Sequence, residues 1–185
     1  MAKRPEAYML QPESATLLLI DWQTRLFDVM PTLFRNKIRS NAENLLWIAQ
    51  MLEIPTVQSE QYPRGLGPSL SGLNTSDLVE KTSFSAMATP EFAAALQEIE
   101  RKQIILTGME THICVAQTCR DLLGAGYDVW VVADAVLSRR SLDWRLGIES
   151  MRLAGASITT TEALLFSLLR DANNPYFKEA SRRIR

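Results

Sequence analysis

Short, nearly all-apolar runs alternate along the chain with longer segments whose apolar residues recur at helical spacing. Runs of the first kind are typical of strands buried on both faces of a parallel sheet. We expect strands at residues 15–20, 54–57, 77–82, 103–107, 127–133 and 156–160. The second kind predicts helices at residues 37–52, 90–100, 113–123, 141–155 and 162–170. This alternation predicts right-handed βαβ units, and hence a three-layer α/β/α fold with a six-stranded parallel sheet of Rossmann-like type.

Capping and turn residues indicate where several of these elements begin. Thr89-Pro90-Glu91 supplies an N-cap, a proline at the first helical position and an acid in the first turn, and Ser141 is expected to cap a later helix. The stretch 61–74 is a loop rich in glycine, proline and serine, long enough to suggest a function. No repeat or linker interrupts the pattern. We expect a single domain over residues 1–185, with a core at about 15–170 and a C-terminal helical extension at 171–185.

Composition and charge exclude several classes of protein. The 185 residues are 46% hydrophobic and carry a net charge of -1, so no basic footprint points to nucleic acid. No apolar run is long enough to span a membrane, and the N-terminal residues lack the apolar stretch of a signal peptide. The two cysteines lie five positions apart on one predicted helix, which argues against a disulfide framework. We therefore expect a cytoplasmic protein.

The stretch 103–115 combines a buried strand, a glycine break and a helix start. Cys114 is expected in the first turn of that helix, just past the carboxyl end of the strand, where open α/β sheets bind ligands. The unpaired N–H groups of a helix start favour negative charge, so the thiol is expected to ionise more readily than a free one. The alternative is that Cys114 is simply a small buried hydrophobic residue.

Two further polar residues fall at strand ends. Asp21 ends the first strand and Lys81 lies near the end of the third, so both can meet Cys114 in one crevice. Together they form a coherent set: a thiol nucleophile, a carboxylate to take its proton, and a lysine to hold the carboxylate ionised. Taken singly, Asp21 can also be a turn residue and Lys81 a solvated surface lysine.

A Cys–His pair and a metal site find less support in the sequence. His112 is the only histidine, and residues two apart on a helix point in different directions, so it is expected to line a pocket or start the helix rather than pair with Cys114. The segment Gln58–Pro63 contains no histidine or cysteine for a zinc site. Glu60 is at most a ligand of an oxygen-only site.

The chain resembles the isochorismatase-like cysteine hydrolase superfamily, and most of all its isochorismatase-domain-containing branch. The resemblance spans Thr16 to about Leu169 and rests on the order and spacing of several pieces. These pieces are Leu19–Gln23, Gln58–Pro63, Gly65–Gly67, Glu80–Ser85, Thr107–Val115, Ala133–Val136, Ser138–Arg139 and Thr159–Glu162.

The resemblance implies an isochorismatase-like hydrolase fold with a catalytic triad. The triad falls on Asp21, Lys81 and Cys114. It also implies a non-proline cis peptide at Met109–Glu110, with the backbone N–H groups of Glu110 and Cys114 forming an oxyanion hole. The substrate pocket is expected to include Gln23, Phe27, Met109 and His112.

Departures from the family pattern narrow the function. Amidase members carry an Asp-x-His metal motif where this chain has Glu60-Gln61-Tyr62, so we expect no metal, no cofactor and a substrate other than nicotinamide. Isochorismatases proper lack the nucleophilic cysteine, so isochorismate is not expected either. Glu110 lies beside the expected oxyanion hole, and we expect its side chain to face away into a structural hydrogen bond.

Two functional hypotheses follow. In the first, the protein is a homo-oligomeric hydrolase that cleaves a C–N bond of a small-molecule amide through a Cys114 thioester, with neither nucleic acid nor membrane as partner. In the second, it is a non-catalytic oligomeric or interaction protein that retains a vestigial site. The second is motivated by the missing metal motif and by the Tyr62–Gly67 loop, which can contact a neighbouring subunit.

Overall fold

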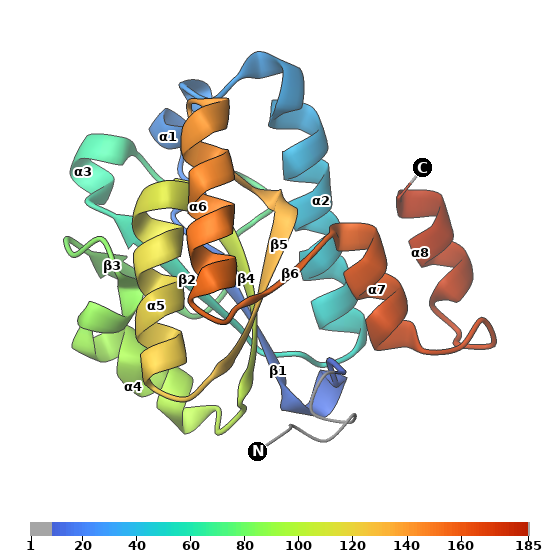
Figure 1. The fold of residues 1–185 in the computed structure, drawn as a ribbon. Coiled ribbons are helices and arrows are strands. Elements are labelled where there is room, and N and C mark those ends of the chain that lie inside the picture. Colours follow the sequence, from blue (N-terminus) through green and yellow to red (C-terminus); the bar gives the residue numbers. More distant parts are fainter. Residues whose placement is uncertain (1–8, 185) are drawn as a thin grey trace.

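A six-stranded, all-parallel sheet with helices on both faces forms the centre of the protein (Figure 1). The computed structural model describes residues 9–184. The strand order is β3-β2-β1-β4-β5-β6, so the chain reverses its direction across the sheet between β1 and β4. The strands are β1 (Ala15–Ile20), β2 (Thr56–Gln61), β3 (Leu78–Lys81), β4 (Gln103–Met109), β5 (Asp128–Leu137) and β6 (Ser157–Thr159). The predicted three-layer α/β/α fold is confirmed.

Helices cover the two faces of this sheet in separate groups. In Figure 1, α2, α7 and α8 lie on one side of the sheet, and α4, α5 and α6 lie on the other. The helices are α1 (Thr24–Asp28), α2 (Thr32–Met51), α3 (Pro63–Leu66), α4 (Pro90–Glu98), α5 (Ala116–Gly124), α6 (Ser141–Leu153), α7 (Thr161–Leu169) and α8 (Phe177–Arg183). Between β4 and α5 lies a single π-helical turn, Thr111–Val115.

The central strand β1 contributes to a separate apolar core on each face. Leu17 and Leu19 belong to the core under α2 and α7, whereas Leu18 and Ile20 belong to the core under α4 and α5. Successive side chains of a strand point to opposite faces, so a strand between two helical layers must be apolar throughout. All four side chains are fully buried, and each stabilises the fold by roughly 2 kcal/mol.

The largest error of the sequence prediction concerns β2. This strand was expected at 54–57 but runs from Thr56 to Gln61, so most of it falls in polar sequence. Its side chains are buried because each finds hydrogen-bond partners: Gln58 accepts from Thr75 and donates to Ser69, while Glu60 accepts from Ser69. Polar side chains satisfied in this way carry no hydrophobic signal.

Other boundaries differ by up to five residues. Helix α2 begins at Thr32 rather than 37, and β5 extends to Leu137 rather than ending at 133. Ser141 is the first residue of α6 and not its cap, because Arg140 occupies the N-cap position and has extended backbone angles. The helix ends at Leu153 rather than 155. Thr89 does cap α4, but its side chain makes no capping hydrogen bond and instead contacts Ser83.

Candidate active site

Asp21 and Lys81 form a buried ion pair at the carboxyl edge of the sheet. Asp21 directly follows β1 with a φ of 52°, a left-handed conformation that is uncommon for residues other than glycine. Its Oδ2 lies 2.7 Å from Lys81 Nζ, and both side chains are fully shielded from solvent. Ser59 Oγ donates to the other oxygen, Oδ1, at 2.7 Å. The carboxylate therefore has a fixed orientation.

Lys81 is held by acceptors on every side. Besides Asp21, its Nζ donates to Gln61 Oε1 at 2.7 Å and to the carbonyl oxygens of Ser83 and Phe84 at 3.2 Å. Burying an ammonium group is costly unless it is paired and hydrogen-bonded, and here both conditions are met. The alternative interpretation of Lys81 as a solvated surface lysine is therefore wrong.

Cys114 lies in the π-helical turn next to this ion pair and is 5% exposed. Burial raises the pKa of its thiol from 9.0 to about 12. The Asp21 carboxylate contributes to this rise, whereas the Lys81 ammonium opposes it, and both side chains are close enough to hydrogen-bond the thiol. The expectation of an easily ionised thiol is therefore wrong for the resting site. Loss of solvation outweighs the field of the helix start and of Lys81.

Cys119, one helical turn further on, provides an internal comparison. It is fully buried in the core under α5, and burial raises the pKa of its thiol to about 12 as well. The pKa of Cys114 and that of Cys119 are therefore alike. What distinguishes Cys114 is the pair of charged groups beside it.

The turn that carries Cys114 is shaped by close backbone contacts. Gly108 has a φ of 135°, and a Cβ atom there would lie 2.1 Å from the carbonyl oxygen of Ile20, so no other residue fits. The Met109–Glu110 peptide bond that follows is cis, as the resemblance implied. The close approach of Gly108 to Ile20 places the end of β4 against the end of β1, which Asp21 follows.

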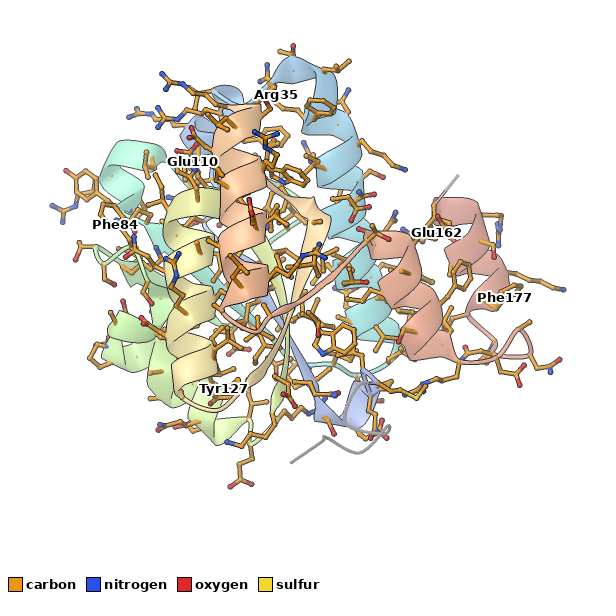
Figure 2. The ribbon with its side chains drawn as sticks, viewed as in Figure 1. Arg35, Phe84, Glu110, Tyr127, Glu162 and Phe177 are labelled. Atoms are coloured by element: carbon orange, nitrogen blue, oxygen red, sulfur yellow. The ribbon has the colours of Figure 1, made fainter. Side chains whose placement is uncertain are left out.

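Glu110 faces away from Cys114, as predicted. Its carboxylate accepts hydrogen bonds from the backbone N–H of Arg139 at 3.0 Å and from Arg139 Nε at 3.1 Å. Figure 2 shows Glu110 in the upper part of the molecule, beside the first turns of α6. The ion pair ties the cysteine turn to the segment after β5 and directs the acidic charge away from the thiol.

Of the four predicted pocket residues, three are buried. Gln23 is fully buried, and its amide bonds the backbone of Gln61 and Gly67, so it holds the 61–67 loop in place. Phe27 and Met109 pack into the core on the α2 face. His112 is half-buried, and its Nδ1 lies 3.0 Å from Ser138 Oγ. A role in substrate binding remains a prediction for all four.

Ser59 and Gln61 are the residues that sequence reasoning missed. Both lie on β2 and orient the ion pair, Ser59 through Asp21 and Gln61 through Lys81. Gln61 is itself held by donating to the Thr82 carbonyl oxygen. Residues 58–61 form an unbroken polar run, so the sequence offered no periodic signal for a buried strand here.

A cavity of about 500 Å³ opens beside Lys81, lined by residues of the 62–64, 80–83 and 88–90 segments. Cys114 is not among its lining residues. Within residues 9–184, no group of three or more His, Cys, Asp or Glu side chains is arranged to hold a metal ion. No described helix is long and apolar enough to cross a membrane.

Comparison with known proteins relates the whole chain to one family. The family model for the isochorismatase domain matches residues 15–163. Isochorismatase domain-containing protein 2 of Xenopus laevis is 43% identical over 94% of this chain and 84% of its own length. A structure named MAR1 ribonuclease, from Caenorhabditis elegans, is 34% identical, with a TM-score of 0.87 over 95% of this chain and 92% of that one. The Escherichia coli YcaC gene product, described as an octameric hydrolase of unknown specificity, is 25% identical, with a TM-score of 0.89 over 94% and 88%.

Proposed function

The chain belongs to the isochorismatase family, and on that premise we propose that it is a cysteine hydrolase cleaving a C–N bond of a small amide. One observation carries the proposal: the Cys114 thiol lies beside a buried Asp21–Lys81 ion pair whose two charges act on its pKa in opposite directions. Buried, oppositely charged groups around a potential nucleophile are a costly arrangement, and such arrangements are concentrated at functional sites.

In the proposed first step, the Cys114 sulfur attacks the amide carbonyl carbon while Asp21 accepts the thiol proton. Because the resting thiol has a raised pKa, the proton leaves only as the C–S bond forms. Collapse of the tetrahedral intermediate breaks the C–N bond, and Asp21 passes the proton to the leaving amine. Lys81 keeps the carboxylate charged before the step and stabilises the developing thiolate.

In the second step, water attacks the thioester. Asp21 removes a proton from the water, the C–S bond breaks, and the proton returns to the sulfur, which restores the resting thiol. The products are a carboxylic acid and an amine. In both steps the same carboxylate carries the proton, so its fixed orientation between Ser59 and Lys81 matters for the chemistry.

The oxyanion of each tetrahedral intermediate is proposed to rest on the backbone N–H groups of Glu110 and Cys114. Glu110 is the N-cap of the turn that follows the cis peptide, and Cys114 lies within that turn. The hydrogen bonds between Glu110 and Arg139 support this role, because they direct the only acidic side chain of the turn away from the place where negative charge develops.

The ribonuclease name of the Caenorhabditis elegans neighbour raises phosphodiester cleavage as a second possibility. Such cleavage usually needs an acid and a base near the scissile bond. The chain has one histidine, His112, and its ring lies near Ser138 and Asp143 rather than forming a pair with the thiol. The site therefore favours acyl chemistry. The octameric state described for the Escherichia coli neighbour supports a homo-oligomer for this chain as well.

An activated ester tests the proposal without knowledge of the natural substrate. With p-nitrophenyl acetate, a nucleophilic thiol should release about one equivalent of p-nitrophenolate per chain in a burst and carry an acetyl group at Cys114. Cys119→Ser is the matched control and should keep the burst, whereas Cys114→Ser should lose it. A wild-type protein with no burst, or a burst retained by Cys114→Ser, would favour the non-catalytic hypothesis.

A further inference from the structure

A second cavity, of about 510 Å³, lies between the amino-terminal parts of α2 and α6, over the end of β5. Figure 1 shows both helices beginning at the edge of the sheet where β5 ends. The walls of this cavity are largely apolar and include Phe34, Ile38, Leu137 and Trp144. None of the three proposed catalytic residues lines it. The volume falls within the range of small-molecule sites, and the carboxyl edge of an open α/β sheet is where such folds bind ligands.

Three polar side chains in these walls already have partners within the protein. Asn41 Nδ2 donates to the carbonyl oxygen of Asp134 at 2.7 Å, and Ser138 Oγ lies 3.0 Å from His112 Nδ1. The indole N–H of Trp144 lies 3.3 Å and 3.2 Å from two backbone carbonyl oxygens of the β5 strand. Because these bonds fix the lining, the cavity is preformed, and most of the surface it presents to a ligand is apolar.

Two charged residues line the cavity. Asp134 is committed to the protein, because its Oδ1 accepts hydrogen bonds from the backbone N–H and the hydroxyl of Thr161 at 2.7 and 2.9 Å. Lys37 is exposed, and among residues 9–184 it makes no hydrogen bond or ion pair. The nearby Arg35, by contrast, is bonded to Asp28. The cavity therefore has an available positive charge at its mouth.

We propose that this cavity is a second binding site, for a small organic anion with an aromatic or branched apolar body. The apolar body would occupy the hollow between α2 and α6, and the carboxylate or sulfonate would pair with Lys37. The proposal does not depend on cysteine chemistry. It requires only the shape of the hollow and the unpaired charge beside it.

A second copy of the chain is a less suitable occupant. Phe34 and Leu142 are about half exposed near the mouth, which gives some apolar surface for self-association. However, an interface over this mouth would also bury Lys37, and a buried charge without a partner is costly. A small anion satisfies the lysine and the apolar walls together.

Two fluorescent probes that differ by one charged group provide the test. 8-Anilinonaphthalene-1-sulfonate has the proposed chemistry, and N-phenyl-1-naphthylamine has the same rings without the sulfonate. We expect saturable binding of the sulfonate at one site per chain. Ser141→Phe places a ring in the mouth from an exposed position and should weaken binding of both probes at least tenfold.

The charge is tested separately. Lys37→Gln should weaken binding of the sulfonate probe two- to fivefold, as expected for one partly exposed ion pair, and leave binding of the neutral probe unchanged. Lys178→Gln, on the exposed side of α8, is the matched control and should change neither. All variants should keep the wild-type melting temperature and the wild-type rate of Cys114 alkylation.

Four results would overturn the proposal in whole or in part. The first is the absence of saturable sulfonate binding, and the second is binding that Ser141→Phe does not weaken, which would locate the probe elsewhere. The third is a shift to a smaller oligomer in Ser141→Phe on light scattering, which would identify a second copy as the occupant. Equal loss of both probes in Lys37→Gln would refute the assignment of the ligand as an anion. A failed acyl-enzyme burst would leave this proposal untouched.

Discussion

Removing each partner of the Asp21–Lys81 pair in turn should shift the pKa of the Cys114 thiol in opposite directions. The Asp21 carboxylate raises the pKa of this thiol and the Lys81 ammonium lowers it. Asp21→Asn therefore should lower the pKa of Cys114, and Lys81→Met should raise it. Both variants should nevertheless lose hydrolysis, because the first removes the proton carrier and the second removes the charge that stabilises the thiolate.

The size of the change follows from the burial of the charges. Two unit charges about 4 Å apart interact by about 4 kcal/mol at an effective dielectric constant of about 20. If rearrangement and entry of water remove about a third of this, the amount of thiolate at neutral pH changes roughly a hundredfold. A more acidic thiolate is also a weaker nucleophile, which offsets about half of the effect on a logarithmic scale. The rate of alkylation should therefore change about tenfold in each direction.

Alkylation with iodoacetamide measures this without a substrate. The rate at Cys114 is followed by mass spectrometry from pH 6 to 10 in a Cys119→Ala background, so that only one thiol reports. Asn is nearly isosteric with Asp, and Met approximates the length of Lys without its charge. Melting curves for each variant are the control, because breaking a buried ion pair costs about 3–5 kcal/mol and a partly unfolded protein would expose the thiol.

Folded variants that shift the pH profile in the same direction would refute the electrostatic assignment. An unchanged profile in Lys81→Met would mean that the lysine serves only to hold Asp21 and its neighbouring carbonyl groups. A slower reaction in Asp21→Asn would mean that the carboxylate already acts as a base in the resting site. Either result would require a different division of roles within the triad.

Three further outcomes are expected. In the wild-type protein, brief alkylation at pH 7 should label Cys114 well before Cys119, because Cys114 has some exposed surface and lies beside the Asp21–Lys81 pair, whereas Cys119 is fully buried; equal labelling would argue against the site. Ser59→Ala should lower the free energy of unfolding by about 1–3 kcal/mol in urea, since Asp21 loses a buried donor, whereas the exposed Ser76→Ala should change it by less than about 0.5 kcal/mol. The pKa of Cys119 is raised in the fold, so its contribution to stability is present below pH 9 and is lost as the pH rises from 9.0 towards about 12. Between pH 7 and pH 10, the free energy of unfolding should therefore fall by about 1.4 kcal/mol less in Cys119→Ala than in the wild type. The same fall in both proteins would refute this linkage.

Apolar periodicity was a good guide wherever burial is achieved by apolar residues. The runs that became β1 and β4 were predicted nearly to the residue, because a strand between two helical layers has no polar face. Strand β2 was misplaced for the converse reason. Its side chains are buried through hydrogen bonds among Gln58, Ser59 and Glu60 and their partners, and such bonds leave no periodic hydrophobic signal.

The candidate site shows the same limit. Sequence order placed Asp21, Lys81 and Cys114 at the same edge of the sheet, since parallel strands end at one edge. It gave no means to judge how deeply they are buried. Ser59 and Gln61 went unnoticed for this reason, and the acidity of the thiol was assigned the wrong direction. Solvation depends on the packing of the whole domain, and a short stretch of sequence does not encode it.

Burial and reactivity are reconciled if the thiol stays protonated until a substrate arrives. A thiolate formed in the resting site would be destabilised by loss of solvation and by the Asp21 carboxylate, and Lys81 alone does not offset this. When the sulfur attacks a carbonyl group, its charge moves to the carbonyl oxygen while the proton moves to Asp21. A fully charged, buried thiolate therefore never forms. In this arrangement the raised pKa protects Cys114 from unselective alkylation and oxidation, because those reactions need the free thiolate, and it leaves open the reaction with a correctly placed acyl group.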